Sequence, residues 1–93
     1  MYIVISSPLF DREIKKFQKQ NSLVVSVYEK SLEVIKVDPF NISRVYQIKK
    51  LTDVPFGKGQ WRIKIGQYRI RYDIDDQTVI LRRIRDRKDV YRK

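Results

Sequence analysis

Residues 61–73, WRIKIGQYRIRYD, alternate between apolar and basic side chains on both sides of the pair Gly66-Gln67. Alternation with a period of two, carried by β-branched and aromatic residues, predicts two half-buried strands. A two-residue connection with glycine first predicts a type II′ β-hairpin. Such a hairpin pairs Ile65 with Tyr68, so one face of the two strands is apolar and the other is basic.

The predicted pairing sets cations directly opposite one another. Lys64 faces Arg69, and Arg62 faces Arg71. Like charges opposite each other across an antiparallel pair are destabilising. A solvated surface normally mixes charges of both signs, yet the first acidic residue of this face is Asp73. The pattern favours a binding site for an anion; the alternative is a solvated face whose long side chains splay into water.

Four further elements are expected around this hairpin. Residues 2–6 form a β-branched run typical of a strand, and residues 7–20 read as a helix with Ser7 as its cap and Pro8 at its first position. Residues 22–38 predict a second helix, which Pro39 ends. Residues 40–59 form a connection with a short extended piece in the sequence RVYQIKKL, and residues 78–85 form a last strand.

The predicted order is therefore β-α-α-β-β-β in a single domain of residues 1–93. Two N-terminal helices can cover the apolar face of a three- or four-stranded, mainly antiparallel sheet, which is an α+β fold. Trp61, Tyr68 and Tyr72 share the face of Ile63 and Ile70, so we expect them in the core rather than stacked on bases.

The composition narrows the function. The chain carries 21 Lys and Arg against 11 Asp and Glu, a formal charge of +10, and most of this excess lies from Lys58 onward. That balance suggests a nucleic acid, an anionic membrane surface or an acidic protein as partner. A membrane surface fits least, because the cations lie on strands rather than on an amphipathic helix. With no signal peptide and no membrane-length apolar run, we expect a soluble cytoplasmic protein.

The absence of histidine and cysteine excludes several chemistries. Histidine acid–base catalysis, Ser-His-Asp triads, thiolates and the usual zinc ligands are all missing. A metal site built only from carboxylates would need residues from the set Asp73, Asp75, Asp76, Asp86 or Asp89. Turn chemistry explains Asp75 and Asp76 better, and Asp86 and Asp89, which lie among arginines, are better explained as internal counter-ions. We therefore expect neither a metal nor another cofactor.

Lysine, arginine and tyrosine remain, and these side chains suit phosphate. Arginine binds phosphoryl oxygens bidentately, and fixed cations can stabilise the extra charge of a phosphoryl transition state. Cationic neighbours favour the neutral form of a lysine, so Lys64 beside Arg69 is a candidate proton acceptor. An RNA strand cut by its own 2′-hydroxyl needs such groups. The alternative is a site that binds the nucleic-acid backbone without chemistry.

The segment GQWRIKIGQYRIRYDIDDQTVILRRIRDRKDVYRK (59–93) resembles the C-terminal half of the RelE toxins, in the RelE/ParE superfamily of bacterial and archaeal toxin–antitoxin systems. The similarity is close from Leu51 to Tyr91, and the element order extends it over the chain. It implies a small antiparallel sheet with two helices on one side. It also implies a ribosome-dependent endoribonuclease that cleaves mRNA in the A site without metal and leaves a 2′,3′-cyclic phosphate.

The resemblance also implies roles for individual residues. Lys64 or Tyr91 activates the 2′-hydroxyl, Arg62 and Arg69 stabilise the phosphoryl charge, and a C-terminal arginine supports the leaving oxygen. Arg87 is preferred over Arg85 for this last role, although Asp86, where many relatives have histidine, could pair with it. Other basic residues of the segment are expected to bind the RNA backbone: Arg71, Arg82, Arg83, Arg85 and Lys88.

Two other functions stay open. ParE-type relatives share the fold but inhibit DNA gyrase and lack the catalytic basic set, and an inactive member would only bind RNA or its antitoxin. For either toxin the resemblance implies a cognate antitoxin as protein partner in a hetero-oligomer. We expect that antitoxin to be acidic where it covers the basic face.

Overall fold

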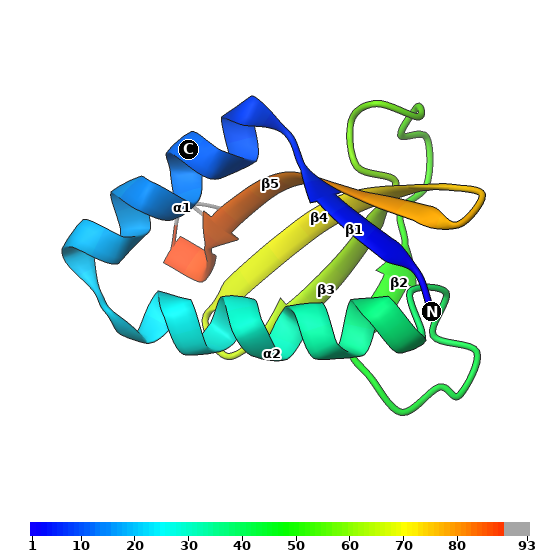
Figure 1. The fold of residues 1–93 in the computed structure, drawn as a ribbon, viewed down its shortest axis with the longest axis horizontal. Helices are drawn as coiled ribbons and strands as arrows, with labels where there is room; N and C mark the ends of the chain where they lie inside the picture. Colours follow the sequence, from blue (N-terminus) through cyan, green and yellow to red (C-terminus); the bar gives the residue numbers. More distant parts are fainter. Residues whose placement is uncertain (89–93) are drawn as a thin grey trace.

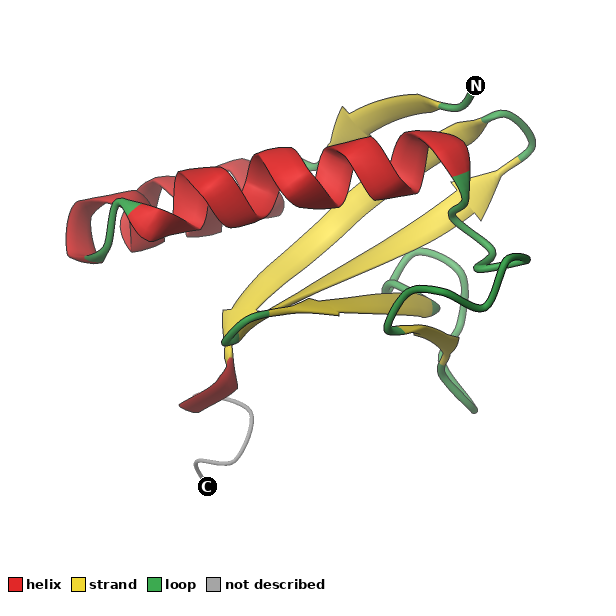
Figure 2. Ribbon diagram, turned by 90° about the horizontal axis from the view of Figure 1, so that it is seen from below, coloured by secondary structure: helices red, strands yellow, loops and turns green. Residues whose placement is uncertain are grey.

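The computed structural model describes residues 1–88. The proposed catalytic residue Tyr91 lies outside the described residues. The elements follow the chain as β1 (Ile3–Ser6), α1 (Pro8–Gln20), α2 (Leu23–Val37), β2 (Ile48–Lys50), β3 (Trp61–Ile65), β4 (Tyr68–Asp75) and β5 (Thr78–Asp86). Both helices pack on the same side of one twisted sheet (Figures 1 and 2). The predicted α+β architecture is therefore confirmed. No helix of this described part is long and apolar enough to cross a membrane.

The sheet has five strands rather than the three or four expected, in the order β1-β5-β4-β3-β2. The extra strand is β2, which forms from the short extended piece predicted in the connection and pairs antiparallel with β3. At the other edge, β1 runs parallel to β5, with Ile3 beside Thr78. The first strand thus joins the sheet beside the last one, as Figure 1 shows.

The helices begin where the sequence indicates. The Ser7 hydroxyl accepts a hydrogen bond from the Phe10 N–H at 3.2 Å, with Pro8 in the first turn of α1. At the start of the second helix the side-chain bond comes from the residue before the cap position. Ser22 makes no side-chain cap, and the Asn21 carboxamide oxygen instead accepts from the Leu23 N–H at 3.0 Å. Despite its many β-branched residues, α2 is a helix, because its apolar stripe packs against the sheet and tertiary burial outweighs propensity.

The core lies between the helices and the apolar face of the sheet. Its buried apolar residues are Phe10, Phe17, Val24, Ile35, Ile48, Ile63, Tyr68, Ile70, Tyr72, Val79, Leu81 and Ile84. Tyr68 and Tyr72 are therefore core residues, as predicted, and Trp61 packs against the cluster with its ring edge-on to Phe40. The Tyr72 hydroxyl donates to the Pro39 carbonyl at 2.7 Å. Burial raises the pKa of this phenol well above its ordinary value, so Tyr72 is a neutral structural side chain.

Candidate functional site

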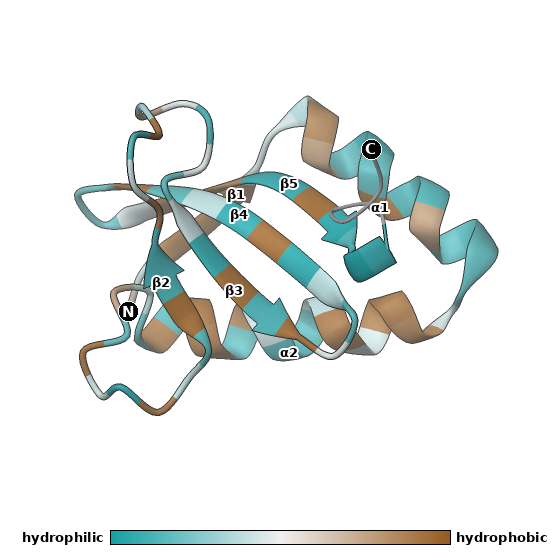
Figure 3. Cartoon of the chain, turned by 180° about the vertical axis from the view of Figure 1, so that it is seen from behind, coloured by the Kyte–Doolittle hydropathy of each residue, from teal (hydrophilic) through white to brown (hydrophobic). Residues whose placement is uncertain are grey.

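The hairpin pairs as its sequence predicts. Lys64 lies opposite Arg69 and Arg62 opposite Arg71 in the β3–β4 ladder. Gly66 has a positive φ of 57° and Gln67 does not, as a type II′ turn requires. Teal and brown residues alternate along these strands in Figure 3, which views the sheet from the side that the helices leave uncovered. Tertiary structure therefore keeps the unfavourable juxtaposition of cations that the sequence encodes.

The row of cations continues into the strands on both sides of the hairpin. On β5, Arg85 lies beside Arg69 and Arg83 beside Arg71. On β2, Lys49 lies beside Arg62. We call this surface the basic face; it comprises Lys49, Arg62, Lys64, Arg69, Arg71, Arg82, Arg83 and Arg85. Four strands contribute to it.

Arg62 and Lys64 line a shallow pocket of about 230 Å³ together with Gln47, Ile48 and Lys49. The pocket forms where the short strand β2 meets β3, and the Lys64 N–H donates to the Gln47 carbonyl at 3.0 Å. Lys49 is a candidate site residue that the sequence analysis missed. Its only signal was the extended piece around residues 44–51, which had no predicted partner strand.

The candidate residues at the end of β5 lie close to the hairpin turn. The Arg87 N–H donates to the Gln67 carbonyl at 2.6 Å, and Arg87 is exposed. Because Lys64 and Arg69 are two residues before and two residues after that turn, all three basic residues gather at one end of the sheet. Lys88 is also exposed.

Asp86, the acidic neighbour of Arg87, has other partners. One carboxylate oxygen accepts from the Gln67 side-chain amide at 3.1 Å, and the other accepts from the Lys88 N–H at 2.9 Å. These bonds hold Asp86 against the turn and the start of the C-terminal segment. Asp86, which the sequence suggested as a partner for Arg87, is therefore already hydrogen-bonded to the Gln67 side-chain amide and the Lys88 backbone N–H.

Four of the five residues predicted to bind RNA have partners within the protein. Arg83 forms a bidentate ion pair with Glu13 of α1, with its shortest contact at 2.7 Å, and this hydrogen bond raises the pKa of the guanidinium. Arg85 lies 3.8 Å from the same carboxylate. Glu13 also accepts from the Ile84 N–H at 3.1 Å, so it fastens α1 to β5. The RNA-binding assignment stays a prediction, now with a structural role beside it.

The other two arginines hold the β2–β3 loop (residues 51–60). The Arg71 Nε donates to the Gly59 carbonyl at 3.0 Å. The Arg82 Nε lies 2.7 Å from Asp73, and the Arg82 guanidinium lies over the Phe56 ring, 5.5 Å from its centroid. A β-bulge at this point of β5 shifts the pairing between Arg71 and Tyr72, which places consecutive arginines on the basic face.

Asp73 is the acceptor on which this loop closes. Its buried carboxylate accepts from the N–H groups of Gly57, Gly59 and Gln60 at 2.9, 3.1 and 2.9 Å, in addition to Arg82. Burial alone would raise the pKa of this carboxyl, but the bonds from Gln60, Arg82 and the two glycines outweigh it and lower the pKa. Asp73 is thus an ionised structural anchor rather than a metal ligand or catalytic acid.

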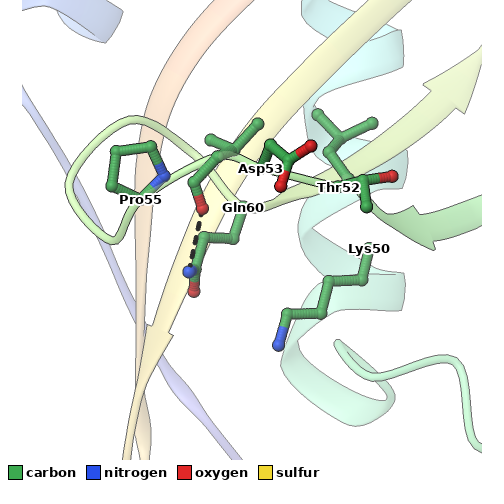
Figure 4. A pocket seen from close by; sticks show the side chains of 7 residues that line it. Lys50, Thr52, Asp53, Pro55 and Gln60 are labelled. Carbon is green, nitrogen blue, oxygen red and sulfur yellow. Dashed lines mark hydrogen bonds between the residues drawn. The ribbon is translucent and has the colours of Figure 1, made fainter.

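A further hollow of the surface lies beside the same loop. It has a volume of about 670 Å³ and is lined by Lys50, Leu51, Thr52, Asp53, Val54, Pro55 and Gln60. Figure 4 shows the Gln60 side chain turned back onto its own loop, where it donates to the Val54 carbonyl at 3.1 Å. Of the proposed catalytic residues that the structure describes, none lines it, so the basic face fits the chemistry better.

Known structures share this fold. The chain is similar to a chain of the RelB–RelE antitoxin–toxin complex of Methanococcus jannaschii, with 21% identity, 94% coverage of each chain and a TM-score of 0.70. It is similar to the RelBE2 complex of Mycobacterium tuberculosis, with 24% identity, coverage of 92% of this chain and 98% of the other, and a TM-score of 0.70. YafQ of E. coli gives 14% identity, coverage of 99% and 100%, and a TM-score of 0.71.

Sequence comparison assigns the family. A search of curated protein sequences gave no significant match. The sequence model described as "ParE toxin of type II toxin-antitoxin system, parDE" matches residues 4–91, nearly the whole chain. This match and the shared fold confirm the resemblance at the level of the superfamily. The chain belongs to the ParE toxin family of type II toxin–antitoxin systems, within the RelE/ParE superfamily.

Proposed function

We propose that this toxin is a metal-independent endoribonuclease that cleaves mRNA in the ribosomal A site. The observation that carries the proposal is the direct apposition of Lys64 and Arg69 across β3–β4, with Arg62 two residues along the same strand. Cations fixed on rigid strands suit a phosphoryl group whose charge grows in the transition state. The similarity to the folds of RelE and YafQ toxins supports the same proposal.

The reaction follows from the groups available. The 2′-oxygen attacks the adjacent phosphorus, the bond to the 5′-oxygen breaks, and the products are a 2′,3′-cyclic phosphate and a 5′-hydroxyl. Lys64 or Tyr91 takes the proton of the 2′-hydroxyl. Arg62 and Arg69 stabilise the phosphoryl oxygens, and Arg87 supports the leaving oxygen while solvent protonates it.

The backbone-binding residues would then hold the strand. Lys88 is exposed, and guanidinium groups with one internal partner keep further N–H donors for phosphate. Arg71, Arg82, Arg83 and Arg85 can therefore serve the fold and the RNA together. A ribosomal substrate places the protein in the cytoplasm.

The protein partner that we propose is a cognate antitoxin. The RelE toxins of M. jannaschii and M. tuberculosis crystallised in complexes with antitoxins. A partner with an acidic segment over the basic face would gain affinity and association rate from charge complementarity. Capture of the tagged toxin from cells that co-express its neighbouring gene should return a small protein in a stable hetero-oligomer, and failure to do so would contradict this proposal.

A gyrase inhibitor is the second candidate, because the family model that matches the chain is that of ParE. A third is an inactive relative that binds only RNA or antitoxin. These functions differ in what the purified protein does to mRNA on programmed ribosomes and to gyrase supercoiling. The endoribonuclease predicts a cut within the A-site codon with a cyclic phosphate end, unchanged by EDTA.

Matched variants test whether residues of the basic face carry out the cleavage. Lys64→Ala and Arg69→Ala should each lower the cleavage rate by about 100-fold, the scale expected for a proton acceptor or an oxyanion donor. Lys30→Ala, which removes an exposed lysine on α2, should cleave at the wild-type rate. Full activity in both site variants would contradict the assignment, and intact mRNA with inhibited gyrase would favour the second candidate.

A further inference from the structure

A second cationic pocket lies on the basic face, apart from the proposed catalytic residues. It has a volume of about 320 Å³ and lies between the start of α1, the β2–β3 loop and the strands β4 and β5. Its lining includes Ser7, Gly57, Lys58, Arg71, Arg82 and Arg83. Neither Lys64 nor Arg69 lines it.

The charge of this pocket remains positive after its internal ion pairs are counted. Lys58, Arg71, Arg82 and Arg83 supply four cations, and the carboxylates of Asp73 and Glu13 pair with two of them. The pocket and its immediate partners therefore keep an excess of two positive charges. An excess held in a concave site focuses potential on an anion.

The arginines of the pocket are held in place by contacts that use only some of their guanidinium N–H donors. Within residues 1–88, Arg71 and Arg82 use Nε for the Gly59 carbonyl and Asp73, and Arg83 uses Nε and Nη2 for Glu13. A guanidinium has five N–H donors. Since the side chains are already fixed, an anion that binds here costs little additional side-chain entropy.

Lys58 completes the pocket from the loop. Its side chain is exposed, and its backbone N–H donates to the Pro55 carbonyl at 3.2 Å. Its side chain thus adds an exposed cation to the lining that Arg71, Arg82 and Arg83 share. The loop that carries it is closed by Asp73, so the carboxylate that anchors the loop also keeps Lys58 at the pocket.

We propose that this pocket binds a backbone phosphate of the RNA strand, separate from the phosphate that is cleaved. The inference rests on the proposed function, because it assigns the same RNA a second contact on the protein. Arg71, which lines the pocket, lies two residues after Arg69 on β4, a distance of about 7 Å along the strand. A strand that presents its scissile phosphate to Lys64 and Arg69 would then be held at two points, which fixes its orientation.

The test measures binding separately from cleavage. A fluorescent single-stranded RNA with 2′-deoxy sugars at every position of the scissile codon cannot undergo 2′-hydroxyl attack, so its Kd reports contacts alone. Lys58→Glu should weaken its binding by about tenfold at low salt, as the loss of one charge-assisted contact implies. The slope of log Kd against log salt should also fall, by about 0.7 for one phosphate contact. Lys30→Glu, with the same change of net charge on the exposed face of α2, controls for long-range electrostatics.

The outcomes separate the two proposals. If Lys58→Glu and Lys30→Glu weaken binding equally, the pocket is not a phosphate site, whatever the protein cleaves. If only Lys58→Glu weakens binding while ribosomal mRNA stays intact, the pocket stands and the nuclease fails. If the wild type binds no RNA, the pocket proposal is wrong, and cleavage on programmed ribosomes decides the nuclease separately. Amide resonances of Gly57 and Lys58 should shift with RNA; if they shift only with an acidic antitoxin peptide, the pocket belongs to that partner and the inference is overturned.

Discussion

The Arg82 guanidinium lies 2.7 Å from the carboxylate of Asp73, and this pair ties the last strand to the loop that closes over the basic face. Asp73 is buried and also accepts three backbone N–H groups of that loop. Asp73→Asn removes the charge and replaces one acceptor oxygen with an NH₂ group, which would face the N–H donors of the loop and of Arg82. It should lower the free energy of unfolding by about 2–4 kcal/mol at pH 7, measured by urea denaturation.

The same substitution should change how stability depends on pH. The pKa of Asp73 is lower in the folded protein than in the unfolded chain, so its contribution is present above the unfolded pKa and is lost as pH falls through the folded one. The gap between wild type and Asp73→Asn should therefore hold from pH 7 to about pH 5 and narrow below about pH 4. Asp76→Asn, at an exposed turn position, should leave stability unchanged at both ends. A gap that does not depend on pH would contradict an ionised anchor.

Removal of one cation from the hairpin should stabilise the fold. Lys64 and Arg69 are opposed across β3–β4, and relief of a like-charge pair is worth about 0.2–1 kcal/mol. Lys64→Gln should therefore raise the free energy of unfolding at low salt while it lowers the cleavage rate. Because salt screens the repulsion, the gain should shrink in 1 M NaCl. Lys30→Gln is the control, and an equal gain in both variants would point to net charge rather than to the pair.

Two glycines of the β2–β3 loop offer a matched comparison. Gly59 has φ of +85°, and a Cβ there would lie 2.8 Å from the Arg71 Cβ, whereas Gly57 has φ of +102° with no atom within 4 Å of its Cβ position. Gly57→Ala should cost only the backbone strain of about 1–2 kcal/mol. Gly59→Ala should cost roughly 1–3 kcal/mol more, because the clash involves the base of a side chain on β4. Thermal or urea unfolding checks the order, and equal losses would mean that the loop does not lie against Arg71.

Substitution of Arg85 and substitution of Arg87 should affect the cleavage rate differently. Arg85 lies 3.8 Å from Glu13, while Arg87 is exposed beside the hairpin turn. Arg87→Ala should lower the rate of ribosomal mRNA cleavage by about 100-fold with little change in stability. Arg85→Ala should lower the rate far less. Single-turnover cleavage at saturating toxin makes the comparison, and the opposite order would assign the role to Arg85.

The hairpin was predictable because all its information is local. The pair Gly66-Gln67 and the alternation around it determine which residues oppose one another, and the observed pairing agrees. The first helix was predictable for the same reason, from Ser7 and Pro8 at its start, and Pro39 marked the end of the second. Elements of this kind need no partner from distant sequence to be recognised.

The structural roles that the sequence did not reveal depend on contacts between distant segments. Asp73 reads as the end of a charge alternation, yet its partners lie 13–16 residues away in a loop of no regular structure. Arg82 and Arg83 break the period of two because of a β-bulge, which alternation cannot reveal. Lys49 joined the basic face only because a three-residue strand paired with β3.

The parallel pairing of β1 with β5 has a consequence for synthesis. The Ser7 hydroxyl donates to the Arg82 carbonyl across 75 positions of the chain, and β5 is the inner neighbour of both β1 and β4. Contacts of such separation close late in folding. A chain that stops before β5 has neither a closed sheet nor an assembled basic face. The basic face is therefore complete only after β5 has been synthesised, and we expect a chain truncated before β5 to lack the assembled site.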